Sequence, residues 1–232
     1  MTNNRRSGFT LVELTLVMAF MSILLLAILY LTIHAGSLYT KGVTNKTLNQ
    51  IGREVNDVMK RDMISADSNR MQIIPEMGSS GDKKSGRLCT GAVTYIWNTA
   101  PLLDDTIATK VKLSTGEAIT FRRVEDPTGT LCVPSGGVYP MTIPVSMKSS
   151  ELLSSSGRDY AIYTMTASSI AKDSTGKGLV SIDMTLGTNE QGTTQKDLVS
   201  GFQCLPPTDN SANFDYCTVQ EFITVLRVGG NN

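Results

Sequence analysis

The chain is poor in the residues that most catalytic and nucleic-acid-binding sites use. It has 232 residues, with one histidine, 6% aromatic side chains and 18% charged side chains, where about 25% charged is usual. Its formal net charge is zero, so no excess of positive charge predicts binding to nucleic acid. None of its four cysteines has the Cys-x-x-Cys spacing that is typical of zinc sites. We expect no cofactor and no nucleic-acid partner.

The single histidine, His34, stands at the end of a long apolar run and far along the chain from the polar C-terminal part. A Ser-His-Asp or Cys-His site would need this histidine as its base. We therefore interpret His34 as an interfacial polar residue and predict that the protein is not an enzyme. Two acidic pairs, Asp104 with Asp105 and Glu125 with Asp126, lie in turn-like segments, where we expect solvated carboxylates and no acid–base chemistry.

The small basic groups at 83–87 and 122–123 are expected to form a solvated face, with contact to DNA or another anionic surface as the alternative. The single tryptophan, Trp97, lies in a predicted strand and is expected in the core.

One long apolar run, residues 9–33, contains no glycine and no proline. As an α-helix it would reach about 37 Å, which exceeds a hydrocarbon core of about 30 Å. Arg5 and Arg6 precede it, so the positive-inside rule places the N-terminus in the cytoplasm and the body of the chain outside. The small residues Ala35 and Ser37 make a poor secretory cleavage site, so we expect the segment to be retained.

The helical pattern continues beyond the apolar run. Apolar residues recur at spacings of three and four, at Leu48, Ile51, Val55, Val58, Met59 and Met63. We predict one helix from about 9 to 66, which spans a membrane over 9–33 and is amphipathic over 34–66. Gly36 and Gly42 each lower helix propensity by up to ~1 kcal/mol, so we expect bends near them.

The sequence period changes to two after a predicted loop at 75–88. We predict strands at 90–98, 108–114, 117–124, 160–168, 178–187, 202–204 and 219–228. Thr115 and Gly116 indicate a hairpin between the second and third of these. Segment 67–232 is thus predicted as a β-rich extracytoplasmic domain with an antiparallel sheet, and the amphipathic helix must cover one face of it to make a core. The predicted fold class is α+β.

The four cysteines belong to the exported part, where an even number indicates disulfides. Three pairings are possible, and we favour Cys89–Cys132 with Cys204–Cys217 because neighbouring cysteines close smaller loops. Each disulfide would add roughly 2–4 kcal/mol of stability.

The segment between Cys204 and Cys217 is rich in Pro, Asn and Asp and has little signal for regular structure. Asp209, Asn210 and Asp215 offer oxygen atoms of the kind that bind Ca²⁺. They lack the regular spacing of a calcium loop, so they remain a calcium candidate and we predict no metal site.

A carboxylate, Glu13, interrupts the apolar run near its start. A charge at the centre of a bilayer costs ~2.5–3.5 kcal/mol on insertion scales, and a side chain near the end of a span avoids this cost by reaching the headgroups. A cut between Gly8 and Phe9 would instead give Phe9 a free amine one helical turn from Glu13. Amine and carboxylate would then pair within a chain or between chains, and pairing between chains would set the register of stacked helices.

The stretch GFTLVEL, from Gly8 to Leu14, follows a short basic leader and opens the apolar run. It resembles the N-terminal motif of type IV prepilins and of type II secretion pseudopilins. The resemblance implies that residues 1–8 are a leader, that a prepilin peptidase cuts after Gly8, and that the same enzyme methylates the amine of Phe9. It also implies a pilin-like fold, with Glu13 as the glutamate that guides assembly.

The resemblance further implies the localisation and the partners. The precursor would lie in the bacterial inner membrane with its N-terminus inside, and the mature chain would join an extracellular filament. Its partners would be the prepilin peptidase and methyltransferase, an inner-membrane assembly platform and other pilin subunits. Segments 55–67 and 221–228 resemble the larger minor pilins and the J-type pseudopilins, and the Cys204–Cys217 segment resembles the disulfide-bounded loop of many pilins. The mid-span proline of many major pilins is absent, with Tyr30 near that position.

We therefore predict a minor pilin of a type IV pilus, which serves adhesion, motility or pilus assembly. The alternative within the same family is a pseudopilin of a type II secretion or DNA-uptake system. A different class of protein, an uncleaved single-pass membrane-anchored binding domain, is the second alternative.

Overall fold

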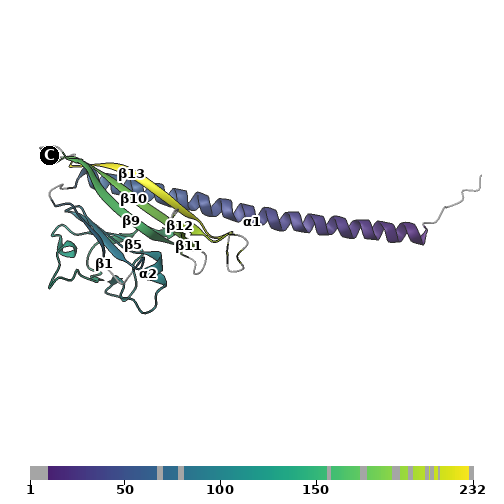
Figure 1. The fold of residues 1–232 in the computed structure, drawn as a ribbon, viewed down its shortest axis with the longest axis horizontal. Helices are drawn as coiled ribbons and strands as arrows, with labels where there is room; N and C mark the ends of the chain where they lie inside the picture. The colour runs from purple at the N-terminus through teal and green to yellow at the C-terminus, as the bar shows by residue number, and fades with distance from the viewer. Residues whose placement is uncertain are drawn as a thin grey trace, which may run out of the picture.

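The computed structural model describes residues 10–66, 70–77, 81–155, 158–172, 177–189, 194–197, 201–206, 209, 212–213 and 215–229. A single long helix, α1 (Leu11–Ile64), leads into a β-rich domain. Figure 1 shows the N-terminal half of α1 projecting from that domain as an isolated rod. Secondary structure is continuous through Gly36 and Gly42, without interruption of the helix at either glycine. The predictions of one long helix and of an α+β fold are confirmed.

A five-stranded antiparallel sheet forms one side of the domain. Its strand order is β1-β2-β3-β5-β7, with β1 (Gln72–Met77), β2 (Ser85–Cys89), β3 (Val93–Asn98), β5 (Phe121–Glu125) and β7 (Ser149–Glu151). A short helix, α2 (Ala100–Asp104), follows β3, and a 3₁₀ turn, η1 (Thr130–Cys132), follows β5.

A four-stranded antiparallel sheet forms the other side, in the order β13-β10-β9-β8. Its strands are β13 (Val219–Val228), β10 (Gly178–Thr188), β9 (Arg158–Lys172) and β8 (Ser154–Ser155). Two smaller sheets complete the domain: the antiparallel pair of β11 (Thr194–Asp197) and β12 (Gly201–Cys204), and the parallel pair of β4 (Lys112–Leu113) and β6 (Thr142–Ile143).

The C-terminal half of α1 supplies the centre of the main core. Its buried residues are Thr44, Leu48, Ile51, Gly52, Val55, Met59 and Met63. They join side chains from both large sheets in one apolar cluster, which includes Trp97, as expected for the tryptophan. The predicted apolar stripe thus packs on the domain of its own chain, with Val58 only half-buried.

Gly52 lets the helix approach the four-stranded sheet closely. A Cβ atom added at this position would lie 2.3 Å from the ring of Phe222 on β13. The ring of Phe222 therefore occupies the space that a side chain at Gly52 would need.

Three details of the predicted strand pattern are wrong. First, the segment 75–88 is not one loop, because β1 continues to Met77 and β2 begins at Ser85. Its glycine and serine content indicated a loop, but Gly86 lies in β2, which pairs with β1 and β3, and the ring of Trp97 covers it. A Cβ at Gly86 would lie 2.1 Å from the indole ring.

Second, the predicted hairpin at Thr115 and Gly116 is present but much shorter than predicted, with an antiparallel bridge between Lys112 and Ala118. Gly116, at φ +95°, makes the expected tight turn, and the amide of Leu113 donates to the carbonyl of Glu117 at 2.8 Å. Residues 108–111 form no strand, and β4 pairs in parallel with β6. The chain after the turn pairs as β5 with β3 and β7.

Third, the body has two large sheets in place of the single predicted one. Alternation in a strand shows that one face is buried, but it does not show which sheet that strand joins. The helix is the element that both sheets share.

Candidate functional site

The most unusual surface of the molecule is the N-terminal half of α1. Its apolar side chains are exposed all round, for example Leu11 at 79%, Phe20 at 65% and Ile33 at 66%. The helix is long and apolar enough to cross a membrane, and none of its most apolar stretch is buried in the protein. A helix that is apolar on every side requires a lipid or protein environment around it.

Glu13 lies in the first turn of this helix and closes a capping box with Thr10. The backbone amide of Glu13 donates to the Thr10 hydroxyl oxygen at 3.2 Å. The backbone amide and the hydroxyl of Thr10 both donate to Oε2 of Glu13, each at 3.0 Å. This arrangement satisfies backbone donors that a helix N-terminus otherwise leaves free.

The capping box was not predicted from the sequence, although Thr10 and Glu13 have its Thr-x-x-Glu spacing. It gives Glu13 a partner within its own helix. Both bonds go to Oε2, and Oε1 has no partner among the described residues. The predicted cleavage site, Gly8 and Phe9, lies outside the described residues, so the pairing of Glu13 with an amine of Phe9 stays a prediction.

A polar clamp joins α1 to the C-terminal segment just beyond the apolar half. Ser37, Lys41 and Asn45 are spaced by four and lie on one side of the helix. The Ser37 hydroxyl donates to Asp215, and the Lys41 ammonium donates to the carbonyl of Cys217. We call these residues, with their partners in 215–218, the proximal clamp.

The third contact of the proximal clamp is the Thr218 hydroxyl, which donates to Oδ1 of Asn45. Burial lowers the pKa of Lys41, and the charge of Asp215 opposes this effect. The clamp fixes the position of the domain along the helix, close to the end of the exposed apolar segment.

Of the three calcium candidates, Asp215 accepts a hydrogen bond from the Ser37 hydroxyl in the proximal clamp. Asp209 lies in the described part of the loop, and Asn210 lies outside it. Among the described residues no group of three acidic, histidine or cysteine side chains is arranged to hold a metal ion.

A second polar contact anchors the C-terminal end of α1 on the five-stranded sheet. Arg123 binds Asp62 with two hydrogen bonds, from Nε at 2.7 Å and from Nη2 at 3.0 Å. The Tyr95 hydroxyl donates to the same carboxylate. Burial and this bond to Asp62 raise the pKa of Tyr95, and the bond to Asp62 raises the pKa of Arg123. Arg123 is therefore part of a helix–sheet contact and not a solvated basic group.

Two disulfides hold the loops of the domain, Cys89–Cys132 and Cys204–Cys217. This is the pairing that the sequence favoured. Cys204–Cys217 joins the end of β12 to the residues of the proximal clamp. Arg158, on β9, lies over the ring of Tyr216, with 4.5 Å from its Cζ atom to the ring centroid. The clamp is thus held from the helix, from β12 and from β9.

Asp126 differs from the expected solvated acid, because it is 1% exposed. Its oxygens accept from the backbone amides of Thr130 at 2.9 Å and Leu131 at 2.8 Å, and so fix the turn after β5. Glu125 is half-buried and pairs with Lys148 at 2.9 Å. The acidic pair thus has a structural role.

Asp104 and Asp105 lie at the end of α2. Burial raises the pKa of Asp104, although its residue surface is largely exposed. A hydrogen bond from Lys83 and two from backbone amides lower the pKa of Asp105. Asp104 is thus an exposed residue, whereas the carboxylate of Asp105 is bound by Lys83 and by the amides of Ile107 and Ala108.

The last two predicted groups are Arg87 and His34. Arg87 is buried, and burial lowers its pKa to about 10; it donates to the carbonyl of Leu131 at 2.6 Å, which corrects its assignment as a solvated cation. His34 is exposed on α1 and its ring is parallel to that of Tyr30, at 6.3 Å between centroids.

A scan against protein-family models and searches of curated proteins and of solved structures found no match.

Proposed function

We propose that the protein is a type IV pilin-like subunit, most similar in kind to a minor pilin, which assembles into a filament through the N-terminal half of α1. The observation that carries this proposal is the helix itself. Its first half is apolar on every side, with a carboxylate in the first turn, and the apolar stripe of its second half is buried against its own domain. The exposed apolar surface of this helix can contact lipid before assembly and the helices of neighbouring subunits after assembly.

The proposed life cycle has three steps. The chain is inserted with its N-terminus in the cytoplasm, and a prepilin peptidase in the inner membrane cuts after Gly8. The enzyme methylates the new amine on Phe9. An assembly platform in the inner membrane then adds the chain to a growing extracellular filament, in which Glu13 of one subunit pairs with the amine of another.

The geometry at Glu13 supports the pairing step. The capping box uses Oε2 and needs only Thr10, which a cut after Gly8 leaves in place. Oε1 then remains for the ammonium of a neighbouring chain. Two charges placed together in lipid cost less than one alone, because each compensates the other.

The proximal clamp supports the filament geometry. It holds the domain against residues 37–45, so that the apolar segment enters the filament while the sheets lie along the outside. Contacts of one surface on a different surface of the next subunit give an open helical polymer. A pseudopilin of a secretion or DNA-uptake system would use the same contacts in a shorter filament.

One observation favours a different class of protein. The capping box gives Glu13 a role in helix initiation that requires neither cleavage nor assembly. An uncleaved, membrane-anchored binding domain would keep the same side chain for that reason alone.

Fractionation of the producing cells tests the proposal. Filaments are sheared from the surface and the protein is quantified in the sheared and membrane fractions, together with the most abundant filament subunit. We expect the protein in the sheared fraction at well below the amount of the main subunit. Its confinement to the membrane fraction would favour the anchored binding domain, and equal amounts would indicate a main subunit.

A further inference from the structure

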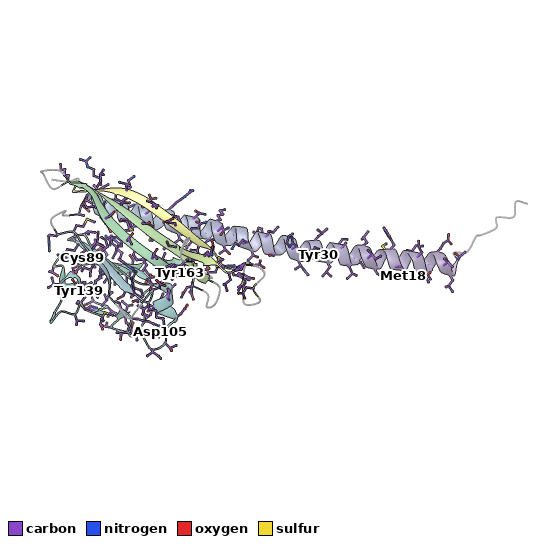
Figure 2. The ribbon with its side chains drawn as sticks, in the orientation of Figure 1. Met18, Tyr30, Cys89, Asp105, Tyr139 and Tyr163 are labelled. Carbon is purple, nitrogen blue, oxygen red and sulfur yellow. A yellow bond between two sulfur atoms is a disulfide. The ribbon has the colours of Figure 1, made fainter. Side chains whose placement is uncertain are left out.

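A pocket of about 420 Å³ opens where strands β1, β2, β3 and β5 of the five-stranded sheet have one of their ends. Its lining includes Arg70, Gln72, Thr128 and Tyr139, together with the Cys89–Cys132 disulfide. We call it the distal pocket, because Figure 2 places Cys89 and Tyr139 at the end of the domain far from Met18 and Tyr30. Pockets for small ligands commonly have volumes of about 300–1,000 Å³.

The distal pocket is preformed. The disulfide joins the end of β2 to the turn that follows β5. Asp126 holds the same turn through the backbone amides of Thr130 and Leu131. A ligand would therefore meet a wall whose conformation is already fixed, which lowers the entropy cost of binding.

The accessible charge of the lining favours an anion, because Arg70 is exposed whereas Asp126 is 1% exposed. Asp126 is the acidic residue of the lining, and its two oxygens are occupied by the donors of its own turn. Arg70 is exposed, and its partner among the described residues is the carbonyl of Pro127, at 3.4 Å from Nη2. A guanidinium has five N–H donors in a planar arrangement that fits a carboxylate.

The remaining lining is suited to a sugar ring. Tyr139 is half-buried, with the guanidinium of Arg87 5.5 Å from its ring centroid. Val133 and Pro134 also line the pocket and are exposed, with Val133 at 62%. A sugar presents C–H groups on one face and hydroxyls at its edge, and the amide of Gln72 offers hydrogen bonds to such hydroxyls.

We propose that the distal pocket binds an acidic sugar, with the sugar carboxylate on Arg70 and the C–H face of the ring against Tyr139. This binding activity goes beyond the proposed assembly function and does not depend on processing at Phe9. In a filament it would lie on the part of the subunit farthest from the apolar segment.

Calorimetric titration of the full chain in detergent micelles at neutral pH tests the proposal. The probes are galacturonic acid, galactose, which has no carboxylate, and N-acetylaspartate, which has carboxylates but no sugar ring. We expect saturable binding of galacturonic acid that is at least about tenfold tighter than that of either other probe, because a charge-assisted pair and ring contact are both needed.

Variants locate the site. Arg70→Gln should weaken binding of galacturonic acid at least about tenfold, and Tyr139→Leu should weaken it as well. Arg53→Gln, an exposed arginine on α1, is the matched control and should bind as the unchanged chain does. Unfolding midpoints of all variants show whether the domain is intact.

Four results would overturn the proposal: no saturable binding of galacturonic acid, equal binding of galactose, equal binding of N-acetylaspartate, or unchanged binding by Arg70→Gln. Each of these concerns the pocket alone. The location of the protein in sheared filaments would be unaffected by them, so failure of this inference and failure of the assembly proposal are distinguishable.

Discussion

At the scale of single residues, Glu13 has two separable roles. In the capping box its side chain needs only an acceptor atom for the Thr10 donors, and glutamine provides one. In the proposed pairing with an amine of a neighbouring chain it needs a negative charge. Substitution by glutamine therefore keeps the acceptor and removes only the charge, whereas substitution by alanine removes both.

We predict that Glu13→Gln and Glu13→Ala are both inserted and cut after Gly8, and that both are poorly incorporated into filaments. Loss of charge removes the pairing in each variant. Immunoblots of sheared and membrane fractions measure incorporation. Glu54→Gln, which changes an exposed glutamate later on α1, is the control. Normal incorporation of Glu13→Gln with loss in Glu13→Ala would leave helix capping as the only role.

Asp62 is the second residue on which a prediction rests, because it accepts from both Arg123 and Tyr95. Asp62→Asn should lower the free energy of unfolding by about 1–3 kcal/mol, since a partly buried arginine loses its charged partner. Urea unfolding of the full chain in detergent micelles measures this change. Asp57→Asn, at an exposed position of the same helix, should change stability little. Equal effects of the two substitutions would contradict the anchoring role of Asp62.

At the scale of elements, Gly42 on α1 and Gly187 on β10 have opposite requirements. A Cβ atom at Gly42 would meet no atom within 4 Å. A Cβ atom at Gly187 would lie 2.8 Å from the backbone oxygen of Thr218 and 2.7 Å from the ring of Tyr163. The Thr218 oxygen also accepts from the amide of Thr188 at 3.0 Å, so it is not free to move away.

We predict that Gly187→Ala lowers the free energy of unfolding by about 1–3 kcal/mol through overpacking. Gly42→Ala should raise it by about 0.5–1 kcal/mol, because alanine favours the helix. Urea unfolding of both variants gives the comparison. Stabilisation by Gly187→Ala would show that β13 lies farther from β10 than the structure has it.

The elements also show what the sequence alone predicts well. Periodicity predicted α1 and the strands β3, β9, β10 and β13, since long regular patterns leave little choice of structure. It missed β2, because Gly86 and Arg87 are residues that are common in loops. In the structure the ring of Trp97 covers Gly86, and the side chain of Arg87 donates to the carbonyl of Leu131. Such contacts join residues far apart in the sequence, and composition does not reveal them.

The candidate site divides in the same way. The position of Glu13 inside an apolar run and the favoured disulfide pairing were both predicted from local spacing and composition. The proximal clamp did not, because Ser37 and Lys41 meet Asp215 and Cys217 only after the whole domain has folded back onto the helix. The spacing of four between Ser37, Lys41 and Asn45 was visible, but nothing in the sequence identified their partners.

At the scale of the whole molecule, the domain is attached to the helix at two places. The proximal clamp holds residues 37–45, and the pair of Asp62 and Arg123 holds the far end. Between them lies the apolar stripe. The helix and domain are therefore expected to move as one body, with the apolar half of α1 as the part that exchanges lipid for protein.

The Cys204–Cys217 disulfide supports the proximal clamp, so its loss should affect the whole molecule. Because the bond closes a short loop, with a sequence separation of 13, replacing both cysteines by serine should lower the free energy of unfolding by about 2–3 kcal/mol. Limited proteolysis should then cut the chain between residues 204 and 217 sooner than in the unchanged protein. An unchanged unfolding midpoint together with unchanged proteolysis would contradict a supporting role.

The central claim is that the chain is cut in the membrane and that its new amine meets a carboxylate one helical turn away. Intact-mass and N-terminal peptide analysis of the protein from the cells that produce it tests this claim most directly. We predict a mature chain that begins at a methylated Phe9, and Gly8→Leu should accumulate with residues 1–8 attached. A chain that begins at Met1 or Thr2 in every fraction would contradict the account.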